Sequence, residues 1–193
     1  MTSAPVRRGE ARRNELEAGV VELVLAEGFA HLTLDDVAAR LRCSKRTLYT
    51  LAGSKEQLVR AAVVGFFRGA TARVEESLGR ARSPRDRIAA YLGAVSRELA
   101  AASPRFFDDV ASFPPAAEVY ERNTRVAARR IGELIDEGVA AGAFRAVHAG
   151  FVADLVAAQM VRIQQRAVAE ATGLSDGEAY AELATLVVDG LAA

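Results

Sequence analysis

The chain of 193 residues has little of several features that mark particular classes of protein. Its one cysteine, Cys43, cannot form an internal disulfide or a multi-cysteine metal site. No apolar run reaches the roughly 18 residues of a membrane-spanning helix, and the first residues lack the apolar stretch of a secretory signal. We therefore expect a soluble, cytoplasmic protein with no membrane partner.

Net charge and tryptophan are also absent, and proline is scarce. The 25 basic side chains balance the 25 acidic ones, so any attraction to nucleic acid must come from a local patch. What the chain has in quantity is apolar residues, at 51%, which excludes intrinsic disorder. Alanine, the best helix former, supplies 40 residues and favours a helical fold.

Capping residues and apolar spacing predict an all-α fold of about nine helices. Serine or threonine N-caps are expected at Thr33, Ser44, Ser54, Ser83, Ser103 and Ser175. Glycines 28 and 142 are expected to end helices. The expected helices cover about 8–27, 34–41, 45–50, 54–80, a start at 84, a start at 104, 114–141, 148–171 and 175–191.

The charges are unevenly distributed along the chain. Between positions 40 and 60 there are six basic residues and a single acid, Glu56, whereas 148–193 holds two basic and six acidic residues. Such a run is often just a solvated face. Here the basic stretch coincides with two short helices joined by a tight turn, the arrangement that enters a DNA major groove as a helix-turn-helix.

Four motifs in this region resemble the N-terminal domain of TetR-family transcriptional regulators. They are Glu27-Gly28-Phe29, 32–38 (LTLDDVA), 44–49 (SKRTLY) and 54–58 (SKEQL). The resemblance implies a three-helix DNA-binding head at 8–65, with its motif at about 33–52, on a larger helical body at 66–193. It also implies that the body forms a homodimer and binds a small-molecule effector, with no cofactor.

Three positions depart from the family pattern. Arg42 occupies the turn where a small residue, often glycine, is usual, and Arg46 stands where glycine is common. Ala52 replaces an aromatic residue that would anchor the recognition helix. The two arginines add charge and change the expected base preference, because Arg46 has the geometry to read a guanine edge.

The expected DNA contacts divide by chemistry. Lys45, Tyr49 and Lys55 are expected to contact phosphates, which carry little sequence information. Base edges are assigned to Arg46, Thr47 and Thr50, and Arg42 suits either role. Thr33 and Ser44 lie at helix N-termini that favour a phosphate, although simple capping explains them equally well. A dimer is expected to bind a palindromic operator.

The body carries aromatic residues and wide apolar stripes, each with two interpretations. Aromatic side chains are more often core than pocket lining, but a helical bundle commonly encloses a cavity. The candidate ligand-binding residues are Tyr91, Phe106, Phe107, Phe113, Tyr120, Gln159, Met160 and Ile163. They favour an apolar or aromatic effector. The last two helices form either core or a dimer interface, with candidate residues Phe151, Leu155, Tyr180, Leu183, Val187 and Leu191.

The expected function is that of a ligand-responsive DNA-binding transcriptional regulator, a repressor that its effector releases from the operator. The only histidines, His31 and His148, have no metal-ligand spacing, and no phosphate-binding loop is present, so we expect no enzyme and no metal. Cys43 suits a buried structural thiol better than a redox switch. The alternatives are a helical small-molecule-binding protein with a degenerate DNA-binding head, or a TetR-like activator.

Overall fold

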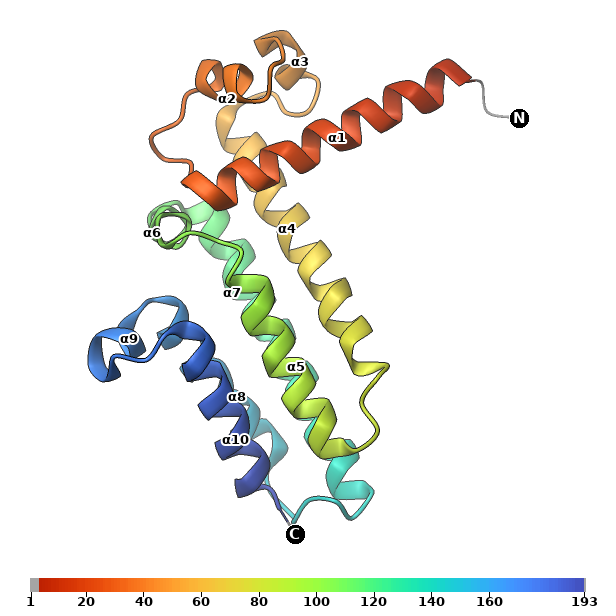
Figure 1. The fold of residues 1–193 in the computed structure, drawn as a ribbon, viewed down its shortest axis with the longest axis vertical. Helices are drawn as coiled ribbons and strands as arrows, with labels where there is room; N and C mark the ends of the chain where they lie inside the picture. The colour runs from red at the N-terminus through yellow and green to blue at the C-terminus, as the bar shows by residue number, and fades with distance from the viewer. Residues whose placement is uncertain (1–3, 193) are drawn as a thin grey trace. The chain divides into compact units, whose positions relative to one another are not determined.

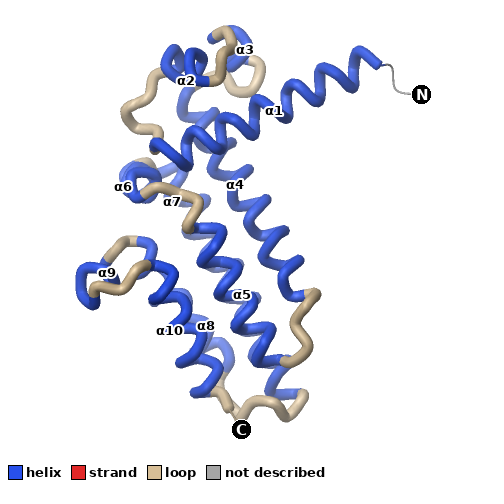
Figure 2. The backbone as a smooth tube through the Cα atoms, viewed as in Figure 1, coloured by secondary structure: helices blue, strands red, loops and turns tan. Residues whose placement is uncertain are grey.

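The computed structural model describes residues 4–192 and shows only helices joined by loops there, without a strand (Figures 1 and 2). One isolated antiparallel bridge joins Phe144 to Ala192. The helices are α1 (Ala4–Glu27), α2 (Leu34–Arg40), α3 (Lys45–Tyr49), α4 (Lys55–Leu78), α5 (Pro84–Leu99), α6 (Pro104–Ser112), α7 (Pro114–Ala140), α8 (Ala149–Gln164), α9 (Ala167–Thr172) and α10 (Asp176–Gly190). The predicted all-α fold is confirmed.

The helix starts follow the capping chemistry of the sequence. Ser83 and Ser103 each cap a helix whose first residue is proline, where the missing N–H costs no hydrogen bond. Ser175 forms a reciprocal capping box with Glu178. At α4 the box is displaced by one residue: Ser54 caps Gln57 N–H, but the Gln57 side chain accepts from the N–H of Gly53.

The described residues form ten helices, one more than the predicted count of about nine. The expected long helix over 148–171 is interrupted after Gln164. There Arg166 adopts the left-handed region with φ of 63°, so that the chain turns before the short helix α9 begins. Arginine does not favour the left-handed region, so the sequence gives no signal for this break.

The chain divides into two compact units. The first combines 1–68 with 102–120, so it contains α1 to α3, α6 and the adjoining parts of α4 and α7. The second combines 69–101 with 121–193. The first stretch ends close to the predicted border at 65, but the first unit also takes in α6. Compactness alone does not define function, so the two predicted domains stay a prediction.

Each unit has its own buried core. In the first, Leu48 of α3, Val63 of α4 and Phe106 of α6 are almost fully buried. In the second, α10 packs against α5 and α8, with Ile135 and Val156 fully buried. Burial of this kind is the main favourable term in folding.

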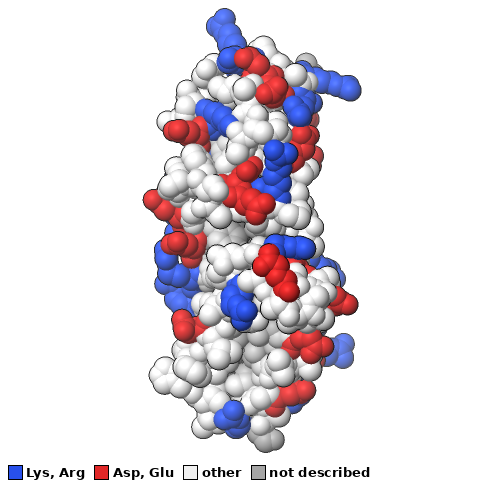
Figure 3. Space-filling model, turned by 90° about the vertical axis from the view of Figure 1, so that its left-hand side faces the viewer, with Lys and Arg blue, Asp and Glu red and all other residues white. Residues whose placement is uncertain are grey.

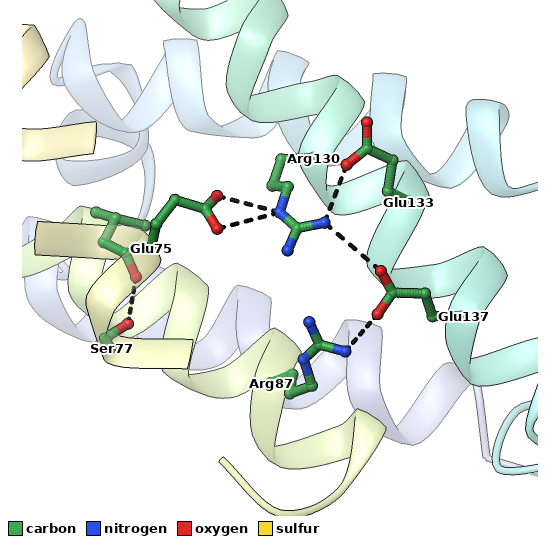
Figure 4. Close-up of polar contacts among 7 residues, drawn as sticks. Glu75, Ser77, Arg87, Arg130, Glu133 and Glu137 are labelled. Atoms are coloured by element: carbon green, nitrogen blue, oxygen red, sulfur yellow. Dashed lines mark hydrogen bonds and ion pairs between the residues drawn. The ribbon is translucent and has the colours of Figure 1, made fainter. Parts of the chain in front are cut away.

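An ion-pair network joins α4, α5 and α7 within the second unit (Figure 4). Nε of Arg130 lies 3.1 Å from Oε1 of Glu75, and its Nη1 lies 2.9 Å from Oε2 of Glu133. Glu137 contacts both Arg130 and Arg87. These ion pairs connect the three helices at a partly exposed surface.

One face of the described surface is mixed in charge. The face drawn in Figure 3 intersperses Lys and Arg with Asp and Glu, and shows no extended patch of one sign. Among the described residues, no helix is long and apolar enough to cross a bilayer. Over the same residues, no group of three or more His, Cys, Asp or Glu could hold a metal ion.

Candidate nucleic-acid interface

The helix α2 is fixed at its start by a capping box. Thr33 Oγ1 accepts from Asp36 N–H at 3.2 Å and donates to Asp36 Oδ2 at 2.6 Å. That hydroxyl bond lowers the pKa of Asp36. The Thr33 hydroxyl and the Asp36 carboxylate are also well placed at the N-terminus of α2, which is the positive end of the helix dipole. Thr33 therefore has the capping role, and phosphate contact by Thr33 stays a prediction.

The turn between α2 and α3 contains Arg42 in the left-handed region, with φ of 50°. The preceding residue, Leu41, is the C-cap of α2, and Cys43 N–H donates to Ala38 O at 3.0 Å. This is the position where the family usually has a small residue. An L-residue with a side chain is strained there, so the sequence departure coincides with a local conformational cost.

The helix α3 is short, has Ser44 as its N-cap and exposes most of its side chains. Ser44 Oγ accepts from Thr47 N–H at 3.1 Å and lies 2.7 Å from Thr47 Oγ1. Leu48 is its buried anchor, at 1% exposure. Around Leu48 the helix exposes Lys45, Arg46 and Tyr49, as well as Thr50 directly after its end.

Two of the expected phosphate ligands already have partners. Lys45 Nζ lies 2.9 Å from Asp35 Oδ2, and this carboxylate raises the pKa of Lys45. Lys55 Nζ donates to Ala30 O at 2.9 Å. Both side chains are at the surface, so a phosphate would share or replace these bonds. Asp35 was not expected to pair with Lys45, although both lie at helix starts ten residues apart.

The predicted DNA-binding residues all fall in the first unit, between the start of α2 and the first residue of α4. Thr47 and Thr50 are tied locally, since Thr50 Oγ1 donates to Thr47 O at 2.6 Å. Arg42 and Arg46 are exposed. The arrangement presents cations, a phenol and hydroxyls on a short helix that Leu48 anchors, and the individual contacts stay predictions.

The predicted ligand-binding residues are divided between the two units. Phe106, Phe107, Phe113 and Tyr120 belong to the first unit, and Tyr91, Gln159, Met160 and Ile163 to the second. Phe106 is fully buried, with its ring 6.5 Å from Phe29 and 6.0 Å from Phe66. It therefore packs in the core of the unit that carries α3.

In the second unit, most of the predicted ligand-binding residues are also core. Tyr91, Met160 and Ile163 are buried, whereas Gln159 is half-buried on an open groove. A further polar pair was not anticipated. Gln164 Nε2 donates to the hydroxyl of Tyr180 at 3.0 Å inside this core, leaving the other amide atom of Gln164 without a partner.

The open groove has a volume of about 540 Å³ and is lined by side chains of α8, α9 and α10. Of the predicted dimer residues, Phe151 and Leu155 are exposed, at 66% and 51%. The other four, Tyr180, Leu183, Val187 and Leu191, are buried within the subunit. Leu186, at 69% exposure, was missed. It lies on the side of α10 that faces away from the core.

The first unit also contains a smaller cavity, of about 290 Å³, near the start of α4. Phe29, Phe113 and Val59 give it apolar walls, and Lys55 and Asp109 line it with charge. Asp109 was not singled out in the sequence. Its partners lie about 80 residues earlier in the chain, and no local pattern marks a contact at that separation.

Comparison with known proteins agrees with this geometry. Residues 18–62 match the profile of the family described as "Bacterial regulatory proteins, tetR family". No curated protein sequence matches the chain. A Saccharomonospora viridis protein, described as a transcriptional regulator in complex with choline, has a TM-score of 0.78 at 17% identity, covering 95% of this chain and 99% of that one.

Two further structures have the same fold. A TetR/AcrR-family transcriptional regulator from Thermobifida fusca has a TM-score of 0.70 at 24% identity, covering 93% of this chain and 98% of its own. The ketosteroid transcriptional regulator KstR2 of Mycobacterium tuberculosis has a TM-score of 0.60 at 18% identity, covering 94% and 95%. The chain thus shares the fold of these solved structures. The predicted resemblance to the TetR family is confirmed over residues 18–62, which match the family's profile.

Proposed function

We propose that the chain is a ligand-responsive DNA-binding transcriptional regulator, acting in the cytoplasm as a homodimeric repressor. The observation that carries the proposal is the presentation of α3. One buried leucine, Leu48, anchors a capped helix whose Lys45, Arg46 and Tyr49 remain at the surface. A short basic helix held in this way fits a DNA major groove.

The proposed contacts divide into those that position the protein on the duplex and those that recognise the base sequence. Lys45, Tyr49 and Lys55 bind phosphates, which orient the protein on any duplex. Arg46 has a planar guanidinium that suits the O6 and N7 acceptors of guanine. It therefore carries the largest share of base preference, assisted by the exposed Thr50.

The homodimer is supported by the apolar face of α8 and α10. Phe151, Leu155 and Leu186 are large apolar side chains that are more than half exposed. Leu155 and Leu186 also line the groove of about 540 Å³. Apolar side chains beside an open groove are typical of an interaction surface, and a second copy of the same face would cover them. A dimer with two symmetry-related helix-turn-helix motifs would bind a palindromic operator.

A small apolar or aromatic molecule is the proposed effector. The candidate ligand-binding residues are mostly aromatic or apolar, and the structure buries Tyr91, Phe106, Met160 and Ile163 among them. Of the neighbours with this fold, one was crystallised in complex with choline and another is described as a ketosteroid transcriptional regulator. An effector that prefers one state of the protein by about 1–3 kcal/mol would change DNA affinity roughly 5- to 150-fold.

The test is a selection of duplexes from a random pool with the wild-type chain and with two variants. Lys55→Ala should weaken binding to all duplexes alike and reduce the salt dependence of binding, since each phosphate contact contributes about −0.9 to the log–log slope. Arg46→Ala should change the selected sequence. Arg122→Ala, at an exposed position of α7, is the control and should change neither. If the wild-type chain retains no duplex in dilute buffer, the proposed function is wrong.

A further inference from the structure

The turn that follows α1 is tied to a helix far away in the sequence. At the end of α1, Gly28 adopts a left-handed φ of 74°. The next two backbone N–H groups, of Phe29 and Ala30, both donate to Oδ2 of Asp109 on α6, at 2.5 and 2.8 Å. One carboxylate oxygen thus holds two consecutive amides of the connection that leads to α2.

The approach of α6 to this turn is close. A Cβ atom added at Gly28 would lie 2.5 Å from Oδ2 of Asp109 and 2.9 Å from Cγ of Arg105. Ser103 N–H, just before α6, also donates to Leu25 O in the last turn of α1, at 2.8 Å. Glycine at 28 therefore permits both the backbone conformation and the contact with α6.

The same turn is also held by the predicted DNA-binding region. Lys55, the first residue of α4, donates to Ala30 O at 2.9 Å. The ring of Phe29 packs edge-on against Phe113 at a centroid distance of 5.7 Å. Residues 28–30 therefore link α6, the start of α4 and the chain entering α2.

Asp109 is badly placed for the stability of its own helix. It lies in the last turn of α6 (Pro104–Ser112), where a carboxylate faces the negative end of the helix dipole. The two charge-assisted bonds to Phe29 and Ala30 offset this disadvantage. They give a reason for an acid at this position that the packing of α6 itself does not supply.

We propose that Asp109 is a positioning residue through which α6 holds the turn before α2 and thereby sets the affinity of the helix-turn-helix for its operator. The proposal rests on the proposed DNA-binding function and names a residue that positions that site. With both amides held, the direction in which the chain leaves α1 is fixed, and so is the placement of α2 and of α3, which packs on it. Loss of the Asp109 carboxylate would release both amides together and free the turn in which the Ala30 carbonyl accepts from Lys55.

The experiment compares Asp109→Ala, Asp109→Asn and Asp108→Ala in the full chain. The adjacent Asp108 is exposed and serves as the matched control. Each variant is titrated with two duplexes, one selected from a random pool by the wild-type chain and one of unrelated sequence. Hydrogen exchange of the Phe29 and Ala30 amides is measured in parallel.

Asp109→Ala should lower affinity for the selected duplex about tenfold, leave affinity for the unrelated duplex unchanged, and speed exchange at both amides. Asp109→Asn should restore most of the affinity, because its amide oxygen accepts the same two bonds. Asp108→Ala should behave as wild type.

Two results would overturn the role of Asp109 alone. One is wild-type discrimination between the duplexes in Asp109→Ala. The other is an equal loss for both duplexes that Asp109→Asn does not rescue, which would mark a residue needed only for folding. A wild-type chain that binds neither duplex overturns the proposed function itself, which distinguishes the two failures.

Discussion

Arg42 shows how a single backbone angle bears on both stability and recognition. Its φ of 50° lies in the left-handed region, where a side chain costs roughly 1–2 kcal/mol and glycine costs much less. The side chain is exposed beside α3, where its charge would favour a phosphate. Retaining arginine there exchanges some stability for added positive charge at the proposed interface.

Arg42→Gly should therefore raise the free energy of unfolding and weaken DNA binding at once. Removing the strain stabilises the folded state, whereas the greater conformational entropy of glycine stabilises the unfolded chain. The net gain in the free energy of unfolding is about 0.5–1 kcal/mol. Urea denaturation measures the gain, and titration with a selected duplex measures the affinity. Arg42→Lys keeps both strain and charge and should match the wild type. A less stable glycine variant would contradict this account.

Tyr91 offers a test at alkaline pH. Its burial, followed by the nearby Glu75 carboxylate, raises the pKa of the phenol to about 12. The unfolded phenol ionises near its usual pKa of about 10. Between these two values the unfolded state has lost a proton that the folded state keeps, so the free energy of unfolding falls as pH rises.

Tyr91→Phe should remove part of that fall. Urea midpoints between pH 9 and 12 are the measurement, and the wild type should lose about 2 kcal/mol more than the variant over this range. Tyr49→Phe, which removes an exposed hydroxyl, is the control. Parallel curves for Tyr91→Phe and the wild type would show that Tyr91 does not contribute to the alkaline loss.

At the scale of helices, the ion pairs of α7 differ in their surroundings. The Arg130 side chain is 24% exposed and faces Glu75, Glu133 and Glu137 from two helices. The Arg125 side chain, on the same helix, is 69% exposed and lies 3.7 Å from Glu121. Exposed pairs contribute little to stability, whereas a shielded cation among three carboxylates prevents their mutual repulsion.

Arg130→Met should accordingly destabilise the protein by about 1–3 kcal/mol, because three carboxylates lose their shared cation. Arg125→Met, the matched control, should cost no more than a few tenths of a kcal/mol. Chemical denaturation at low and high ionic strength measures both. The Arg130 effect should shrink in about 1 M salt, where the screening length falls to roughly 3 Å. Equal effects of the two substitutions would rule out a special role for the network.

Helix starts were predictable from sequence because capping is local. Ser103 with Pro104, or Ser175 with Glu178, places all the required groups within four residues. The break at Arg166 was not predictable, since arginine does not mark a left-handed backbone in the sequence. The bonds of Asp109 to Phe29 and Ala30 were equally out of reach, because they join residues about 80 positions apart.

The candidate site was predictable to the extent that it is continuous in sequence. Residues 33–55 contain their own caps, turn and anchor, so their grouping on α2, α3 and the start of α4 followed from the motifs. The exposed and buried residues of the helical body, 66–193, were harder to predict. An apolar stripe does not distinguish Leu183, which packs inward, from Leu186, which is 69% exposed, because both lie on a helix rich in apolar residues.

At the scale of the whole molecule, the proposed dimer depends on the apolar face of α8 and α10. Leu186→Glu places a charge in the middle of the proposed contact and should convert the dimer to a monomer, because an unpaired charge is costly to bury. Sedimentation over a concentration series is the measurement. Val126→Glu, at an apolar residue of α7 that is 39% exposed, is the control and should remain dimeric. A wild-type monomer, or a dimeric Leu186→Glu variant, would exclude this interface.

The first compact unit is assembled from two separate stretches, 1–68 and 102–120. A truncated peptide ending at 68 would lack the Phe106 ring from its interior and the Asp109 carboxylate from the turn after α1. Such a fragment should be only marginally folded. A chimera that places this helix-turn-helix on another scaffold must therefore include residues 102–120 as well. Fusion of the N-terminal stretch alone should not transfer its DNA specificity.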